Sequence, residues 1–231
     1  MANFFNIEIV GTSHISPESK KRILSSFNKL KPSIVCVELD RERLQGLRAK
    51  NRKGPGLSSI KHIGVTGYLF ALIGGFIQRK LGNLTGMMPG EELLLGVSLA
   101  EKNKLRLELI DLDVRLTLKK LRRMPFREKM RLVWDILRAP FQRKKRVKID
   151  ISGIPEESLV LELISQLKSR YPYLYKVIIH DRNKFMAKKL FVLSRENPSL
   201  SILAIVGEGH TKGLIDELKR LDDSNVSFVK Q

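Results

Sequence analysis

The chain has a single cysteine among its 231 residues, which excludes a disulfide bond within it. Cys36 lies inside an apolar run at residues 34–37, so we expect a small buried hydrophobic residue and not a nucleophile. A chain without disulfides is typical of a reducing compartment, and this predicts a cytoplasmic location. Aromatic residues are also few, at 6%. Because proteins that bind single nucleic acid strands interleave aromatic and basic residues, the sequence argues against a nucleic acid partner.

Acidic residues are scarce relative to basic ones, with 24 Asp and Glu against 43 Lys and Arg and a net charge of +19. Most of the excess lies between Arg115 and Lys148, where 14 basic residues occur with only Glu128 and Asp135. Dense positive charge attracts phosphate groups. The segment is therefore interpreted either as a peripheral contact with an anionic membrane surface or as a solvated helix face.

Long apolar runs are missing as well. The uncharged stretch at residues 63–77 would reach about 22 Å as a helix, against a hydrocarbon core of about 30 Å, and it contains four glycines. We expect a buried helix there, with a membrane-contacting helix as the alternative. The first five residues have neither a basic region nor a long apolar region, so no secretory signal is expected.

The composition, 42% hydrophobic and 29% charged, is that of a folded chain. Short β-branched runs alternate with helical patterns, which predicts an α/β fold with a mostly parallel central sheet of about four to five strands flanked by helices. We expect one domain over residues 1–231, with a helical basic insertion at about 113–196. The expected strands are residues 7–10, 33–39, 105–110, 202–206 and 226–229. The basic segment should be interrupted near Pro125 and Pro140, and a helix is expected at residues 210–221.

Two Gly-x-x-His motifs follow expected strands, one from Gly11 to His14 and the other from Gly207 to His210. Ligands of open α/β sheets bind at the carboxyl ends of the strands, so both histidines are expected along one edge. Glycine allows a sharp turn there that aims the imidazole inward. The alternative interpretation is that each histidine is a hydrogen-bonded turn residue.

Carboxylates are expected at the same edge. Glu38 ends the second predicted strand and Asp111 follows the third. Two imidazoles with one or two carboxylates are a typical ligand set for zinc, manganese or iron. His62 lies in a basic loop and His180 on an expected helix, and both are interpreted as structural.

Other common site motifs do not fit. The stretch at residues 207–213 has the glycines of a dinucleotide loop, but Gly213 comes one position late and only 18 residues follow it. A phosphate-binding Gly-x-x-x-x-Gly-Lys-Ser/Thr loop and a His-Glu-x-x-His motif are both absent from the sequence. The edge marked by the two Gly-x-x-His motifs therefore stays the candidate site.

Several motifs in this order resemble those of the TraB/PrgY family, and together they cover nearly the whole chain. They read Gly11-Thr12-Ser13-His14-Ile15-Ser16, Val37-Glu38-Leu39-Asp40, Pro89-Gly90-Glu91-Glu92-Leu93, Leu109-Ile110-Asp111-Leu112-Asp113-Val114-Arg115-Leu116-Thr117-Leu118, Arg182-Asn183-Lys184-Phe185-Met186-Ala187 and Val206-Gly207-Glu208-Gly209-His210. That family is similar to the wider TraB, GumN and Tiki group, whose fold is related to erythromycin esterase-like and ChaN-like proteins. Tiki members are metal-dependent proteases, and PrgY and TraB limit the activity of peptide pheromones.

The resemblance implies a hydrolase of peptides that uses a divalent metal such as Mn, Co, Zn or Fe. Carried over to this sequence, it implies metal ligands at His14, His210 and Glu38, catalytic roles for Glu38, Glu92, Arg115 and Arg182, and supporting roles for Gly11, Asp111, Gly207 and Gly209. Whichever of Glu38 and Glu92 is not a ligand would be the general base. An arginine, Arg115 or Arg182, would stabilise the oxyanion.

Two positions depart from the family pattern. Leu112 follows Asp111 where relatives often have arginine, and Asn183 follows Arg182 where they have aspartate. These departures favour the alternative of a non-catalytic protein that sequesters a peptide or another ligand on the same fold. The sequence leaves open whether the chain forms a homo-oligomer.

Overall fold

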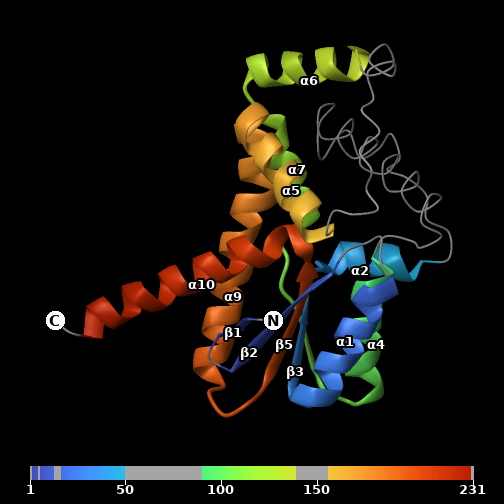
Figure 1. Cartoon of the computed structure of the whole chain (residues 1–231), viewed down its shortest axis with the longest axis vertical. Coiled ribbons are helices and arrows are strands. Elements are labelled where there is room, and N and C mark those ends of the chain that lie inside the picture. The colour runs from blue at the N-terminus through green and yellow to red at the C-terminus, as the bar shows by residue number, and fades with distance from the viewer. Residues whose placement is uncertain (1, 5, 13–16, 50–89, 139–155, 230–231) are drawn as a thin grey trace.

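The structure is a computed structural model of the whole chain, and it describes residues 2–4, 6–12, 17–49, 90–138 and 156–229. Its centre is a sheet in the order β1-β2-β5-β3-β4 (Figure 1). Four strands are parallel, and the short β1 is antiparallel to β2. The bounds are β1 Ala2–Phe4, β2 Ile7–Thr12, β3 Ile34–Val37, β4 Arg106–Leu109 and β5 Ile202–Gly207. The predicted α/β fold with a mostly parallel sheet is confirmed.

Strand β5 comes last in the sequence but lies in the middle of the sheet. Its first residue, Ile202, pairs with Ile7 of β2 on one side and with Ile34 of β3 on the other. The carboxyl ends of β2, β5, β3 and β4 therefore meet at one edge. The residues that follow these strands are the ones that the sequence analysis selected.

Both faces of the sheet are covered by helices, which explains the nearly continuous apolar strands. Val35 and Val37 face α1 (Pro17–Leu30) and α4 (Glu91–Lys102) in one core. Ile34 and Cys36 face α9 (Asp181–Glu196) and α10 (Glu208–Val229) in the other core. Cys36 is fully buried, as predicted, and burial raises the pKa of its thiol.

A group of helices extends away from the sheet as an arm (Figure 1). It consists of α5 (Val114–Arg122), α6 (Phe126–Arg138), α7 (Glu156–Arg170), α8 (Pro172–Tyr175) and a π-helical turn (Lys176–His180) that leads into α9. A small core of Leu121, Met124, Leu174 and Val177 joins α5 to α8 and the π-helical turn, and Leu167 of α7 packs against it. The predicted break at Pro125 separates α5 from α6, whereas Pro140 lies outside the described residues. The division into one domain with an insertion at 113–196 stays a prediction.

The prediction of a final strand at residues 226–229 is wrong, because α10 continues through Val229. Residues 222–225, between the expected helix and the expected strand, contain neither glycine nor proline to end the helix. A short apolar run also does not distinguish a strand from a helix. The additional strand is instead β1, which pairs with β2 through Ala2, Asn3 and Phe4.

The structure bears in part on the question of a membrane span. Within the described ranges, no helix combines the length and the apolar character needed to cross a bilayer. The helix expected at residues 63–77 lies outside the described residues.

Candidate functional site

A cluster of buried charged and polar side chains lies at the carboxyl edge of the sheet. Glu38 directly follows β3, Asp111 follows β4, and His210 lies in the first turn of α10 after β5. Arg182 reaches the same place from the first turn of α9. Contacts between these four side chains form one connected network. The structure thus brings together four of the residues that the sequence analysis selected.

Glu38 is held by both of its carboxylate oxygens. Oε2 accepts a hydrogen bond from the backbone N–H of Gly207 at 2.6 Å, and Oε1 accepts one from Arg182. Burial acts to raise the pKa of this carboxyl. The two nearby guanidinium groups, the amide hydrogen bond and, once it is protonated in acid, the neighbouring imidazole together outweigh burial and lower its pKa to about 2. Glu38 is therefore ionised at neutral pH.

Arg182 connects Glu38 to Asp111. Its Nε and Nη2 donate to the two oxygens of Asp111 at 2.8 and 2.7 Å, which is the bidentate arrangement. Nη2 also donates to Glu38, and Nη1 donates to the carbonyl oxygen of Ile178 at 3.2 Å. These four hydrogen bonds all end on acceptors of the protein, so the guanidinium is fixed in place.

His210 contacts the cluster through both ring nitrogens. Nδ1 lies 2.6 Å from Oδ1 of Asn183, and Nε2 lies 3.4 Å from Oε1 of Glu38. Because an amide oxygen only accepts, Nδ1 carries the hydrogen and Nε2 carries the lone pair that faces Glu38. Burial lowers the pKa of His210 and outweighs the opposing effect of Glu38, so the imidazole is neutral at pH 7.

Asn183 has a specific place in this arrangement that the sequence analysis missed. A Cβ atom built on Gly213 would lie 2.1 Å from Nδ2 of Asn183, so only glycine leaves room for this side chain. This explains why glycine stands at position 213, where it does not fit a dinucleotide loop. Gly213 follows Gly209 by one helical turn, and this pair of glycines on one side of α10 could have indicated close packing against α9.

Arg43 is a second member of the cluster that the sequence analysis missed. It lies in the first turn of α2 (Arg41–Arg48), whose N-cap Asp40 accepts hydrogen bonds from the N–H groups of Glu42 and Arg43. Nη1 of Arg43 donates to Asp111 at 2.5 Å and to the carbonyl oxygen of Glu38 at 3.4 Å. Because α2 begins only a few residues after β3, its first turn lies close to the carboxyl edge of the sheet. A basic residue in that turn could therefore have been predicted to join the cluster. About a third of the Arg43 side chain is exposed.

Glu92 is fully buried in the first turn of α4. One turn later, a Cβ atom on Gly96 would lie 2.5 Å from Ile205 and 3.1 Å from Val37, so this side of α4 packs closely on β5 and β3. Residues four apart share a helix face, so Glu92 faces the sheet too. Because α4 leads from the carboxyl edge towards the start of β4, Glu92 is closer than Gly96 to that edge.

Two predicted residues are not brought into the cluster by the described contacts. Arg115 pairs with Glu42 at the surface, and its side chain is 69% exposed. His14 lies in the segment at residues 13–16, outside the described residues. Among the residues that the structure does describe, no group of three His, Cys, Asp or Glu side chains is placed to hold a metal ion.

The supporting glycines allow close packing at the same edge. A Cβ atom on Gly11 would lie 2.3 Å from Oε2 of Glu208 and 2.7 Å from Oγ1 of Thr211, so the end of β2 closely approaches the first turn of α10. One on Gly207 would lie 3.3 Å from Oε2 of Glu38. One on Gly209 would lie 3.2 Å from Ile164 of α7.

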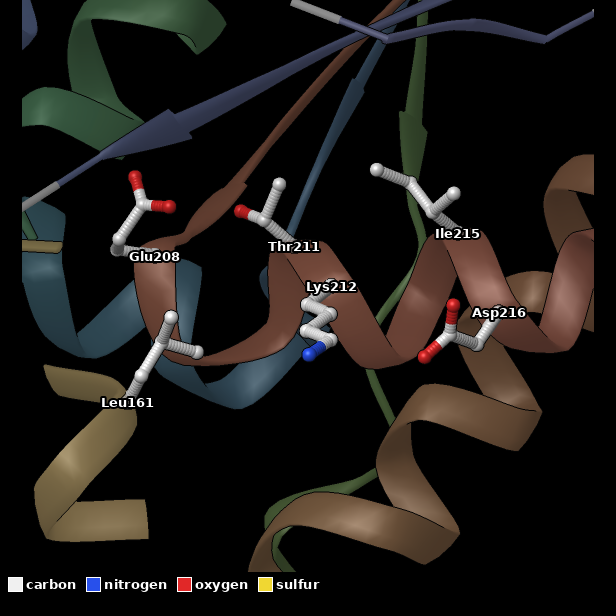
Figure 2. Close-up of a pocket in the computed structure, with 6 residues that line it drawn as sticks. All are labelled: Leu161, Glu208, Thr211, Lys212, Ile215 and Asp216. Carbon is white, nitrogen blue, oxygen red and sulfur yellow. The ribbon is translucent and has the colours of Figure 1, made fainter. Parts of the chain in front are cut away.

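A small pocket lies beside the first turns of α10 (Figure 2). It has a volume of about 190 Å³ and is lined by Leu161, Glu208, Thr211, Lys212, Ile215 and Asp216. Figure 2 shows Leu161 on α7 and the other five residues along α10. Glu208 and Thr211 are also the side chains that approach Gly11, so the pocket adjoins the end of β2. Its charged lining residues are Glu208, Lys212 and Asp216.

The sequence was compared with models of known protein families to test the resemblance to the TraB/PrgY family. The sequence model of the TraB/PrgY/gumN family matches residues 5–224. This chain belongs to the TraB/PrgY/gumN family. The match includes every strand from β2 to β5 and all the residues of the buried cluster, so the family resemblance inferred from the motifs is confirmed.

Individual relatives extend beyond this chain. A protein of Methanocaldococcus jannaschii, named only as uncharacterized, is 32% identical over 228 residues, which are 96% of this chain and 56% of the relative. TraB domain-containing proteins of Homo sapiens and Mus musculus are each 23% identical over 233 residues, 90% of this chain and 61% of theirs. The chain thus spans little more than half the length of these family members.

Proposed function

We propose that this TraB family protein is a metal-dependent hydrolase of peptides in which Glu38 and His210 bind a divalent cation. The observation that carries the proposal is the distance of 3.4 Å between Nε2 of His210 and Oε1 of Glu38. Two ligands that each lie about 2.0–2.2 Å from a tetrahedral zinc ion are about 3.4 Å apart. The separation of the two atoms therefore fits a shared cation.

The protonation states of the pair support the same interpretation. Metal ligands must be deprotonated, and Glu38, with a pKa of about 2, is ionised. His210 is neutral because burial lowers its pKa. Asn183 accepts the hydrogen of Nδ1 and so directs Nε2 at Glu38, which is the usual second contact of a metal-binding histidine.

His14 is the third ligand of the proposed site. It follows Thr12 by two residues, and Thr12 pairs with Gly207 in the register of β2 and β5. Because two residues of chain reach at most about 7 Å, a side chain at position 14 is within reach of this edge, which is why we propose it as the third ligand.

The pKa of Glu38 assigns the roles of the two carboxylates. A divalent cation in this site supplies a Lewis acid for the scissile carbonyl. A carboxylate with a pKa of about 2 is a poor proton acceptor at neutral pH, so Glu38 acts as a ligand. Glu92, buried on the sheet-facing side of α4, is then the general base that accepts a proton from the attacking water.

The contacts of the three arginines near the site indicate that Arg43 stabilises the oxyanion. Arg182 donates its hydrogen bonds to Asp111, Glu38 and Ile178, and Arg115 lies at the surface. Arg43 contacts Asp111 through Nη1 and keeps part of its side chain accessible. We therefore assign the stabilisation of the developing negative charge to Arg43, with Arg182 as a positioning residue.

A second candidate function is the binding of a peptide or another ligand without turnover. It is favoured by the contacts of Glu38, whose two oxygens already accept hydrogen bonds from Arg182 and Gly207. Under this alternative the carboxylate belongs to a structural network of hydrogen bonds and does not act as a cation ligand. This alternative predicts a protein that binds peptides in the absence of divalent metal.

The metal content of the full chain, produced without a histidine tag, separates the two functions. Inductively coupled plasma mass spectrometry should find close to one divalent ion per chain in the parent protein and in His180→Ala. His14→Ala and His210→Ala should have lost it. His180 is a matched control because it is a partly exposed histidine outside the cluster.

A peptide library analysed by mass spectrometry then tests turnover. Cleavage that requires metal and is lost in Glu92→Gln supports the hydrolase. Full metal content in His210→Ala, or peptide binding without cleavage by the metal-loaded protein, would contradict it.

A further inference from the structure

Helix α6 exposes a row of large apolar side chains at the end of the helical arm. Phe126 is 75% and Trp134 55% exposed, and Met130 and Val133 are exposed as well. At 100° per residue these four positions lie within an arc of about 100° on one side of the helix. Figure 1 shows α6 lying across the far end of the arm formed by α5 and α7. This surface is called the outer face of α6 below.

The opposite side of α6 is fixed to the protein through its two acidic residues. Glu128 is buried and accepts hydrogen bonds from the N–H groups of Tyr173 and Leu174, at 3.2 and 2.9 Å, in the first turn of α8. Asp135 accepts two hydrogen bonds from Arg170 at the end of α7, at 2.6 and 2.5 Å. The apolar side chains therefore face away from the arm.

These contacts also determine the charge around the outer face. Glu128 and Asp135 are the only acidic residues between Arg115 and Lys148, and both are directed inwards. Arg127 and Arg138 border the apolar arc on the side of Trp134. Lys129 borders it on the other side, where its ammonium also donates to the carbonyl oxygen of Arg122 at 3.0 Å. The guanidinium of Arg138 lies 4.5 Å from the ring centroid of Trp134. The outer face is thus an apolar strip with basic borders.

We propose that α6 is an interfacial membrane helix whose outer face inserts into the headgroup region of an anionic bilayer. A helix with Phe and Trp on one side and Arg and Lys along the borders lies in the plane of such an interface. Anionic lipid headgroups complement the basic borders, and the apolar strip reaches the beginning of the acyl chains. Nothing in this inference depends on the proposed hydrolase activity.

Charge distinguishes a membrane from a second copy of this chain as the occupant. Two outer faces brought together would place their arginines and lysines against each other, and like charges at short range repel. The net charge of +19 adds to this repulsion. An anionic lipid surface meets the same borders with opposite charge.

Trp134 is the only tryptophan of the chain, so its fluorescence reports directly on the outer face. The full chain is titrated with vesicles of phosphatidylcholine alone and with vesicles containing about one third phosphatidylserine. We expect co-sedimentation and a blue shift of the Trp134 emission with the anionic vesicles only. Raising the salt concentration should weaken the binding.

A matched pair of variants tests the helix itself. Val133 and Val192 are 41% and 42% exposed, and Val192 lies on α9, away from the outer face. Val133→Glu should lower the affinity for anionic vesicles by about tenfold or more, because it places a negative charge in the apolar strip. Val192→Glu makes the same change of charge and should bind like the parent. Arg127→Gln should lower the affinity about fivefold.

Three results would overturn the proposal. The first is equal loss of binding in Val133→Glu and Val192→Glu, both shown to be folded by circular dichroism. The second is sedimentation with anionic vesicles without a shift of the Trp134 emission, which indicates adsorption by charge alone. The third is a blue shift that depends on protein concentration without lipid, which indicates a second copy on the outer face.

Discussion

Asn183 accepts a hydrogen bond from Nδ1 of His210 at 2.6 Å, in a space that exists because residue 213 is glycine. This contact links α9 to α10 and fixes the tautomer of the imidazole. It shows how Asn183 can take the place of the aspartate that the family resemblance implies at this position. Either side chain offers an oxygen to the histidine, and only the charge differs.

Gly213→Ala should therefore impair the proposed metal site without replacing any of its three ligands. The new Cβ would lie 2.1 Å from Nδ2 of Asn183 and would displace the amide from His210. Loss of such a second contact lowers metal affinity by about 10- to 100-fold. Competition with a fluorescent zinc chelator measures the affinity. Unchanged affinity in a folded Gly213→Ala protein would show that the hydrogen bond does not orient the imidazole.

Asn183→Asp should raise the pKa of His210. The substitution keeps the oxygen that accepts from Nδ1 but adds a buried negative charge, which favours the protonated imidazole. Titration of the imidazole by NMR in the metal-free protein measures the change. A pKa that stays the same or falls would contradict the hydrogen-bond assignment between these residues.

Removing the charge of Glu38 should destabilise the fold strongly. Glu38→Gln leaves Arg182 and Arg43 with Asp111 alone, so positive charge remains uncompensated in a buried cluster. The expected loss is about 3–5 kcal/mol of the free energy of unfolding, measured by urea denaturation. Glu101→Gln is the control, because Glu101 pairs with Arg48 at the surface, where ion pairs contribute about 0–1 kcal/mol. Similar losses in the two variants would refute the assignment of a buried network.

The free energy of unfolding should decrease on acidification in two steps. The pKa of His210 is below 6.5 and that of Glu38 is about 2 instead of 4.5, so the unfolded chain binds more protons in both ranges. Stability is therefore full above pH 6.5, falls below that value as His210 becomes protonated in the unfolded chain, and falls further below pH 4.5. Urea denaturation followed over this pH range measures both steps. His210→Gln should lack the first one, and a variant that keeps it would assign the step to another group.

Two glycine substitutions should have opposite effects on stability. Gly11→Ala brings a Cβ within 2.3 Å of Glu208 and 2.7 Å of Thr211, and such overpacking costs about 1–3 kcal/mol. Gly46→Ala places a methyl group in open space on the exposed side of α2 and should stabilise the protein by about 0.5–1 kcal/mol. Thermal unfolding of both variants measures the difference. Destabilisation of Gly46→Ala would show that α2 packs differently in solution.

The sequence predicts the edge of the sheet well but not the contacts made there. Glu38, Asp111 and His210 each follow an apolar run, and the ends of parallel strands must meet. The partners of these residues depend on the rotation of helices, which periodicity does not reveal. Arg43 and Asn183 enter the cluster in this way.

Local irregularity and weak patterns account for the other differences. The π-helical turn at Lys176–His180 rotates the direction of the side chains that follow it, including Arg182. No pattern in the sequence predicts this turn. Arg115 is placed in the site by family resemblance, but its partner Glu42 holds it at the surface. Three residues of β1 are too few to show an alternating pattern.

The central position of β5 has a consequence for how the protein acquires its fold. Until residue 202 is available, β2 and β3 have no strand between them, because neither pairs with the other. At about 5–20 residues per second, a ribosome needs roughly 8 to 33 seconds to proceed from β3 to β5. During that time the nascent chain carries unpaired strand edges, which are sites of aggregation. We expect its synthesis in cells to depend on chaperones that shield β2 and β3 until β5 has been made.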